Sequence, residues 1–243
     1  MKELADKRKR FGCRRLHLLL RREGFMINHK RTERIYRQER LSIRIRRRRK
    51  IAASLRTEIP RPRHQNHIWS MDFMKDCLSD GRKIKILPVI DEYTKRCFQI
   101  EVDTSINGIR VVRTLNDIAL KEGLPEVIIV DNGPEFISKG LDEWAYRRGV
   151  NLFFITPGKP VEKMYMESFN GRLRDECLNM HYFTSLDYAR SIIEEWRIDY
   201  NTERPHSSLG NLTPEEFIQK IKEKTGAAKA AENTLINADF PNC

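Results

Sequence analysis

Residues 127–134 have the sequence Val127-Ile128-Ile129-Val130-Asp131-Asn132-Gly133-Pro134, and this stretch decides the fold. Four consecutive apolar residues are typical of a strand that is buried on both faces. The Asn-Gly-Pro triplet then predicts a sharp end to that strand, because these residue types favour turns. The acidic residue between strand and turn occupies the place where open α/β sheets bind ligands.

The segments around this strand alternate between predicted strands and predicted helices. Alternating hydrophobicity and turn residues predict strands over 68–74, 84–90, 97–102 and 151–155. Apolar residues at helical spacing predict helices over 107–122, around 141–149 and over 162–179, and two more that begin near Ser185 and Thr213. This order predicts an α/β fold, a mixed five-stranded sheet with flanking helices.

The N-terminal region has a different pattern. A helix is predicted over 8–23, with Leu16, Leu19 and Leu20 on one face and Gly24 as its stop. Asn28 is the predicted N-cap of a second basic helix that ends near Arg40. Two such helices joined by a tight turn indicate a helix-turn-helix whose second helix enters a major groove. An ordinary helical hairpin is the alternative.

Positive charge is concentrated at the N-terminal end. Residues 1–63 hold 23 Lys and Arg against 6 Asp and Glu, and because the whole chain is +12, the remainder carries −5. A basic cluster over 44–50 favours a polyanion partner over a merely solvated surface. We therefore expect a DNA-binding helix-turn-helix region and linker over 1–59, a separate α/β core over 60–224, and a disordered tail over 225–243.

The cysteines and the hydropathy limit the class of protein. The cysteines are odd in number and scattered, at Cys13, Cys77, Cys97, Cys177 and Cys243. A zinc site built on Cys13, His17 and His29 would lack a fourth ligand. No apolar run is long enough to span a membrane, and no signal sequence is recognisable. Together with the basic N-terminal region, these patterns predict a cytoplasmic protein, without membrane partners, that is associated with the nucleoid.

Three acidic residues stand out by position. Asp72 lies in a predicted strand among apolar residues, Asp131 ends the buried strand, and Glu167 lies on the helix after the fifth strand. The predicted fold brings all three to one edge of the sheet, where their mutual repulsion favours a bound divalent cation such as Mg²⁺. Taken singly, each acid has an ordinary structural explanation. Their conjunction, with 35 residues between Asp131 and Glu167, instead favours a shared functional role for the three acids.

Several segments resemble the integrase core of insertion-sequence transposases of the OrfB type, which are relatives of retroviral integrases. These segments are Trp69-Ser70-Met71-Asp72-Phe73, Asp131-Asn132-Gly133-Pro134-Glu135-Phe136, and the run from Glu167-Ser168-Phe169-Asn170-Gly171 to Glu176. The segment from Tyr200-Asn201 to Gly210 is similar to the family's C-terminal signature, and Arg14-Arg15-Leu16-His17 to its N-terminal one.

The resemblance implies an RNase H-like fold and a transposase that cleaves and joins DNA strands by metal-dependent phosphoryl transfer. It implies that Asp72, Asp131 and Glu167 are the catalytic residues and hold two Mg²⁺ or Mn²⁺ ions, with Asp72 bridging them. It also implies a homo-oligomer on the element's terminal repeats and on target DNA, and an OrfA-type partner or fusion. The expected DNA contacts are Lys159, Lys163, Asn170, Arg174, Arg46, Arg47, Arg48 and Arg49, although solvated surface charge would also explain the lysines.

Other interpretations remain open at this stage. A DNA-binding regulator would use the basic region alone, and an RNase H-like nuclease would share the fold and the metal ions. Arg204 and His206 either contact DNA or build a structural turn. A tyrosine or serine recombinase is disfavoured, because Tyr165, Tyr188 and Tyr200 have the pattern of packing residues.

Overall fold

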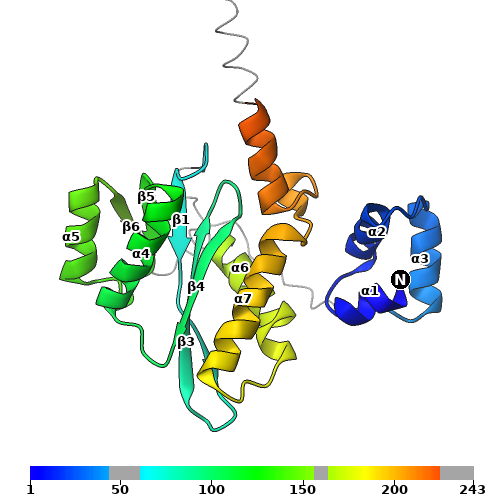
Figure 1. The fold of residues 1–243 in the computed structure, drawn as a ribbon, viewed down its shortest axis with the longest axis horizontal. Coiled ribbons are helices and arrows are strands. Elements are labelled where there is room, and N and C mark those ends of the chain that lie inside the picture. The colour runs from blue at the N-terminus through cyan, green and yellow to red at the C-terminus, as the bar shows by residue number, and fades with distance from the viewer. Residues whose placement is uncertain (44–60, 156–163, 225–243) are drawn as a thin grey trace, which may run out of the picture. The chain divides into compact units, whose positions relative to one another are not determined.

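The computed structural model describes residues 1–43, 61–155 and 164–224. This part of the chain forms two compact units. One lies within Met1–Ile59 and Pro160–Tyr182, and the other within Pro60–Lys159 and Phe183–Cys243. Figure 1 labels most of the helices and strands of both units.

Three helices form the N-terminal part of the first unit: α1 (Lys2–Lys7), α2 (Cys13–Arg22) and α3 (His29–Gln38). Their small core contains Phe11, Leu16, Leu19 and Tyr36. The predicted N-cap is confirmed, because the side chain of Asn28 accepts a hydrogen bond from the backbone N–H of Lys30 at 3.0 Å. The helix-turn-helix arrangement of α2 and α3 is therefore fixed by local signals.

The first predicted helix was placed too early and α1 was missed. Gly12 has an extended backbone (φ −77°, ψ 170°) and acts as the N-cap of α2, so the helix begins at Cys13 instead of residue 8. Phe11, immediately before it, is 5% exposed, and the chain turns there to bury this ring. Burial of the ring thus overrides the helical propensity of the basic residues before it.

The same unit contains α6 (Met164–Glu176) and the 3-10 turn η2 (Leu178–Met180). A single helix over 162–179 was predicted. Within the described residues α6 instead ends at Glu176, because Cys177 leaves the helical conformation (φ −129°, ψ −68°). Two ion pairs join α6 to the N-terminal helices: Arg10 to Asp175 at 3.2 Å and Arg15 to Glu176 at 3.3 Å.

The second unit is built on a mixed sheet. Its strands are β1 (Ile68–Met71), β2 (Met74–Cys77), β3 (Lys83–Asp91), β4 (Cys97–Asp103), β5 (Val127–Val130) and β6 (Asn151–Phe154). The strands β1, β5 and β6 are parallel, while β3 runs antiparallel to β1, β2 and β4. The mixed sheet with flanking helices is as predicted, except that it has six strands instead of five.

The extra strand arises because the segment predicted as one strand over 68–74 is interrupted at Asp72 and Phe73. Met71 pairs with Val89 and Met74 with Ile86, so the same register places Asp72 opposite Pro88. Proline has no N–H to donate to a neighbouring strand. The ladder therefore breaks at the aspartate.

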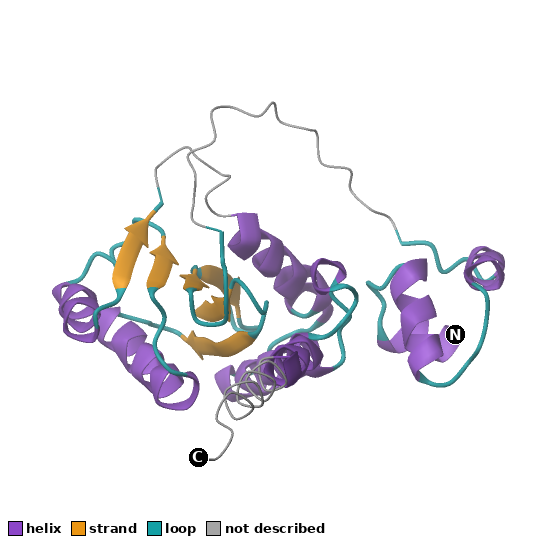
Figure 2. Ribbon diagram, turned by 90° about the horizontal axis from the view of Figure 1, so that it is seen from above, coloured by secondary structure: helices purple, strands orange, loops and turns teal. Residues whose placement is uncertain are grey.

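Two helices build the core of this unit with the sheet, as Figures 1 and 2 show: α4 (Gly108–Glu122) and α5 (Lys139–Arg148). Their caps follow local rules, since Asn107 and Ser138 accept hydrogen bonds from the first turns and Gly149 ends α5 in the left-handed conformation. The core includes Trp69, Met71, Leu87, Val89, Val111, Leu115, Ile128, Val130, Phe136, Leu141 and Trp144.

The C-terminal part of the unit contains α7 (Leu186–Thr202), the 3-10 turn η3 (Ser207–Leu209) and a helix over 214–224. Helix α7 begins beside Ser185 as predicted, and the Ser185 side chain accepts a hydrogen bond from the N–H of Tyr188. The backbone N–H of Thr213 donates to Glu216 Oε2 at 2.7 Å, and the N–H of Glu216 donates to Thr213 Oγ1 at 3.2 Å, which is a capping box. The helix therefore starts where the sequence predicts.

Candidate active site

Two predicted catalytic residues occupy matching positions at the ends of adjacent parallel strands. Ile68 pairs with Val127, 59 residues further along the chain, and Asp131 likewise lies 59 residues after Asp72. Parallel strands are about 4.8 Å apart, so the register brings the two aspartates side by side at the carboxyl edge of β1 and β5. Asp72 is 8% exposed and Asp131 is half-buried.

The turn after β5 fixes the position of Asp131. The N–H of Gly133 donates to Asp131 Oδ1 at 2.9 Å, and the side-chain amide of Asn132 donates to the carbonyl of Ile155 at 2.7 Å. A β-carbon on Gly133 would lie 2.9 Å from Asp131 Oδ1 and 3.3 Å from Glu135 Oε2. A side chain at position 133 would thus displace the carboxylate of Asp131.

Lys85 and Glu135 are polar residues of this edge that the sequence analysis missed. Lys85 Nζ donates to Glu135 Oε1 at 2.5 Å, although the two residues are 50 positions apart. This hydrogen bond from Lys85 holds the pKa of Glu135 below its ordinary value, against the opposing charge of Asp131. A charged residue within the apolar strand β3 was the signal that could have drawn attention to Lys85.

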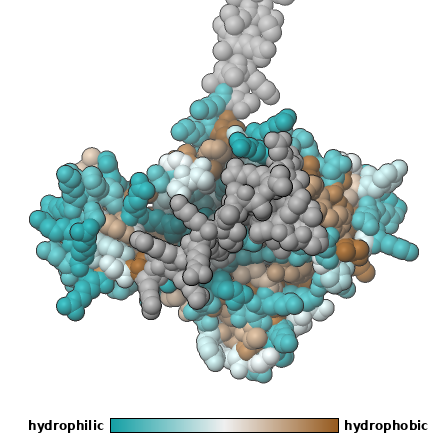
Figure 3. Space-filling model, turned by 180° about the vertical axis from the view of Figure 1, so that it is seen from behind, coloured by the Kyte–Doolittle hydropathy of each residue, from teal (hydrophilic) through white to brown (hydrophobic). Residues whose placement is uncertain are grey.

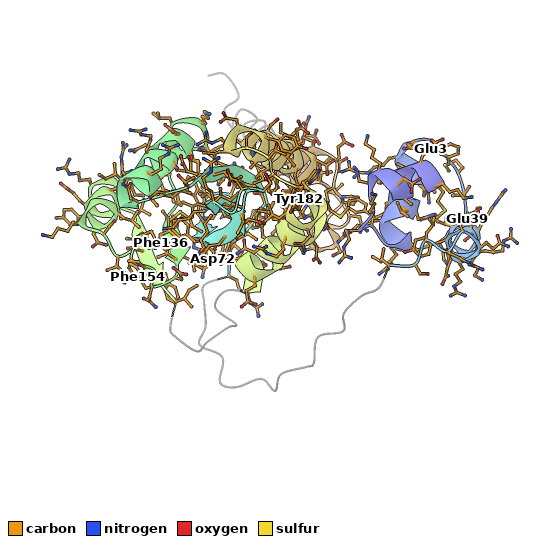
Figure 4. All side chains as sticks on the ribbon, turned by 90° about the horizontal axis from the view of Figure 1, so that it is seen from below. Glu3, Glu39, Asp72, Phe136, Phe154 and Tyr182 are labelled. Atoms are coloured by element: carbon orange, nitrogen blue, oxygen red, sulfur yellow. The ribbon has the colours of Figure 1, made fainter. Side chains whose placement is uncertain are left out.

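Aromatic contacts connect the segments that follow the two aspartates. Phe73 comes directly after Asp72, and its ring centroid lies 5.0 Å from that of Phe136. Lys85 Nζ lies 5.7 Å from the centroid of the Phe73 ring. Figure 4 labels Asp72 and Phe136 among the side chains of this region. An aromatic contact therefore joins the segments that follow Asp72 and Asp131.

The third predicted catalytic residue, Glu167, is half-buried on α6 in the first unit. Met166, Phe169 and Leu173 are buried on this helix, and Asn170 and Arg174 are half-buried. Over residues 1–43, 61–155 and 164–224, no three Asp, Glu, His or Cys side chains gather closely enough to hold a metal ion. The structure thus places the two aspartates together, and the convergence of Glu167 with them stays a prediction.

The N-terminal helices present a basic surface. Thr32 and Tyr36 are buried on α3, whereas Lys30, Arg31 and Arg34 are exposed. Figure 3 shows mostly hydrophilic side chains over this part of the molecule. The other predicted DNA contacts, Arg46, Arg47, Arg48, Arg49, Lys159 and Lys163, lie outside the described residues.

The C-terminal signature segment has a structural role. Arg204 and His206 are 2% and 4% exposed. His206 Nε2 lies 3.2 Å from the carbonyl oxygen of Tyr200, and the ring of Tyr200 contacts both residues, edge-on at 4.6 Å for His206 and at 5.6 Å from the Arg204 guanidinium. Of the two roles considered for Arg204 and His206, a structural turn or a DNA contact, the buried side chains therefore fit the structural turn.

Across the part of the chain that the structure describes, no helix is long and apolar enough to cross a membrane.

The sheet order, the aspartate pair and the N-terminal helices define a protein with an integrase core and a helix-turn-helix. Residues 62–160 and 148–214 each match a family described as "Integrase core domain", and residues 1–58 match one described as "HTH-like domain". Known structures share the fold. The core of an HTLV-2 integrase solved with magnesium aligns with a TM-score of 0.50 at 21% identity, over 63% of this chain and 97% of that one. A simian T-cell lymphotropic virus intasome chain aligns with a TM-score of 0.58 at 18% identity, over 88% and 73%.

Curated relatives are considerably closer in sequence. The insertion element IS407 uncharacterized 31.7 kDa protein of Burkholderia multivorans is 48% identical over 234 residues, which are 96% of this chain and 84% of the relative. The IS476 uncharacterized 39.2 kDa protein of Xanthomonas euvesicatoria is 45% identical over 220 residues, which are 90% of this chain but only 64% of that longer protein. The chain belongs to the insertion-element transposases of the integrase-core superfamily.

Proposed function

We propose that Asp72, Asp131 and Glu167 are the catalytic residues with which this transposase cleaves and joins DNA strands. The observation that carries the proposal is the register of β1 and β5, which aligns Asp72 with Asp131 at the carboxyl edge of the sheet. Glu167, 35 residues beyond Asp131 and on a helix, would complete the set. Both reactions would be phosphoryl transfers, with water and then a freed 3′-OH as the attacking group.

The donor chemistry at this edge suits a hard divalent cation. Two adjacent carboxylates repel each other, and oxygen ligands are those that Mg²⁺ prefers. Asp72, Asp131 and Glu167 would together hold two Mg²⁺ or Mn²⁺ ions. Bound there, the ions would activate the attacking oxygen and stabilise the charge on the leaving 3′ oxygen. The Gly133 N–H would keep Asp131 oriented by its 2.9 Å hydrogen bond.

The basic N-terminal region would bind the ends of the element. Residues 1–59 would bind the terminal repeats, with α3 in a major groove. Residues 60–224 would cleave and join the DNA strands. Additional phosphate contacts would come from Arg46, Arg47, Arg48, Arg49, Lys159, Lys163, Asn170 and Arg174. The protein would act as a homo-oligomer on nucleoid DNA, with an OrfA-type partner or fusion.

A strand-transfer assay with Mg²⁺ or Mn²⁺ on a branched DNA substrate tests the catalytic assignment. We expect Asp131→Asn and Glu167→Gln to abolish joining while DNA binding stays near the wild-type level, because a neutral amide oxygen binds a divalent cation much more weakly than a carboxylate. Asp142→Asn is the matched control. Because Asp142 is exposed on α5, this variant should join DNA as the wild type does.

Unchanged joining in either active-site variant would refute the triad. A wild-type protein that binds DNA but joins none, with or without added OrfA-type partner, would instead favour the DNA-binding regulator. The HTH-like match of residues 1–58 is the observation that supports this second candidate.

A further inference from the structure

One ammonium group contacts both segments that follow the aspartates of the site. Lys85 Nζ bonds Glu135, four residues after Asp131, at 2.5 Å, and lies 5.7 Å from the ring of Phe73, which directly follows Asp72. The side chains of Lys85 and Glu135 are 29% and 21% exposed, so both are largely withdrawn from water. This placement distinguishes the pair from the exposed ion pairs of the molecular surface.

Glu135 is a fourth carboxylate beside the proposed metal site. Its Oε2 and the Oδ1 of Asp131 lie 3.3 and 2.9 Å from the same point, the position that a β-carbon of Gly133 would take. One oxygen of Glu135 therefore lies near Asp131, while the other accepts the hydrogen bond from Lys85. A cation bound at Asp131 would attract Glu135 strongly unless another positive charge engages it.

We propose that Lys85 is a positioning residue that retains Glu135 in an ion pair and so keeps this fourth carboxylate out of the metal-binding set. The inference rests on the proposed function, because it takes Asp131 to be a metal ligand. The pair is also neutral overall, so it adds no net charge beside the two aspartates. The same ammonium lies 5.7 Å from the centroid of the Phe73 ring, within the range of a cation–π contact.

The electrostatic consequence can be measured by titrating the full-length protein, without DNA, with Mn²⁺ and following free Mn²⁺ by electron paramagnetic resonance. Lys85→Met should lower the half-saturating Mn²⁺ concentration roughly fivefold, the order of effect of one unit charge on a dication across several ångströms of water-like dielectric. Glu135→Gln should raise it by a similar factor, because Lys85 then repels the ion. The double variant should return close to the wild-type value.

Lys83→Met is the matched control, because Lys83 is exposed on the same strand and should leave Mn²⁺ binding unchanged. Lys85→Arg, which keeps the charge, should also bind Mn²⁺ like the wild type. A purely structural role for Lys85 would weaken Mn²⁺ binding in both single variants, without recovery in the double variant, and that result would overturn the inference.

Asp131→Asn separates this inference from the proposed function. If that variant binds Mn²⁺ as the wild type does, the metal site itself is wrongly assigned. If Asp131→Asn loses Mn²⁺ binding but Lys85→Met does not change it, the metal site stands and only the role of Lys85 is refuted.

Discussion

Replacing Gly133 by alanine should slow DNA cleavage while leaving the protein folded. The new β-carbon would lie 2.9 Å from Asp131 Oδ1, whereas ordinary contacts of this kind begin at 3.4 Å, so the carboxylate must retreat by about 0.5 Å. A misplacement of 1 Å in an active site costs on the order of a hundredfold in rate, which predicts about a tenfold loss here.

The effect of this change on stability should be small. Gly133 is not among the glycines with positive φ, so alanine suits its backbone, and the atoms in its way are the ends of side chains that can rotate. We expect the free energy of unfolding to change by less than about 1 kcal/mol. The prediction thus separates activity from stability.

The assay compares single-turnover cleavage rates with urea unfolding for Gly133→Ala and for Gly140→Ala. Gly140 lies in α5, and a β-carbon added there would meet no atom within 4 Å, so its replacement should leave cleavage unchanged and add up to about 1 kcal/mol of stability. A wild-type cleavage rate in Gly133→Ala would refute the argument that the position of Asp131 limits catalysis. A loss of several kcal/mol in stability would show that the turn matters for folding instead.

Three further predictions concern other parts of the molecule. Asn201→Ala should lower the free energy of unfolding, measured in urea, by about 3 kcal/mol. The buried amide of Asn201 accepts a hydrogen bond from the N–H of Cys97 at 2.9 Å and donates one to its carbonyl at 2.8 Å, and both would be lost. A loss below about 1 kcal/mol would contradict this reasoning. Burial raises the pKa of Glu92 above its ordinary 4.5, so the folded state binds this proton more tightly and stability falls as pH rises above about 4.5. Glu92→Gln should therefore gain stability at neutral pH and lose that advantage below pH 4.5, and a pH-independent difference in thermal unfolding would refute this sign. Arg34→Ala, on the exposed face of α3, should weaken DNA binding. It should also make the slope of log K for DNA association against log salt concentration shallower by about 1. An unchanged slope would exclude a phosphate contact.

Local chemistry explains why most element boundaries could be predicted from the sequence. Asn28, Ser185 and Thr213 each accept a hydrogen bond from the first turn of the helix that follows, and this requires only a few neighbouring residues. The predicted boundaries were wrong where contacts with other parts of the folded chain determine where an element begins or ends. The start of α2 depends on burial of Phe11, and the break in the first strand depends on Pro88 opposite Asp72.

The same distinction applies to the candidate site. Asp72 and Asp131 could be singled out because one is an acid within a predicted apolar strand and the other ends one, and the parallel pairing then places them together. The Lys85–Glu135 pair spans 50 positions and depends on how β3 lies relative to the turn after β5. No local pattern encodes such a contact, so only the folded structure could show it.

Under the proposed function, the irregularity at Asp72 serves the active site. A proline opposite the middle of a strand removes a ladder donor, and an aspartate that is 8% exposed costs solvation energy, so neither residue favours a stable sheet. Violations of the local rules for folding are expected mainly where function requires them. With the ladder interrupted there, β1 ends at Met71 and the aspartate occupies the first position beyond it, in register with Asp131 beyond β5. Pro88 thus contributes to the position of Asp72 by ending the strand, which links a backbone defect in β3 to the geometry of the carboxylate pair.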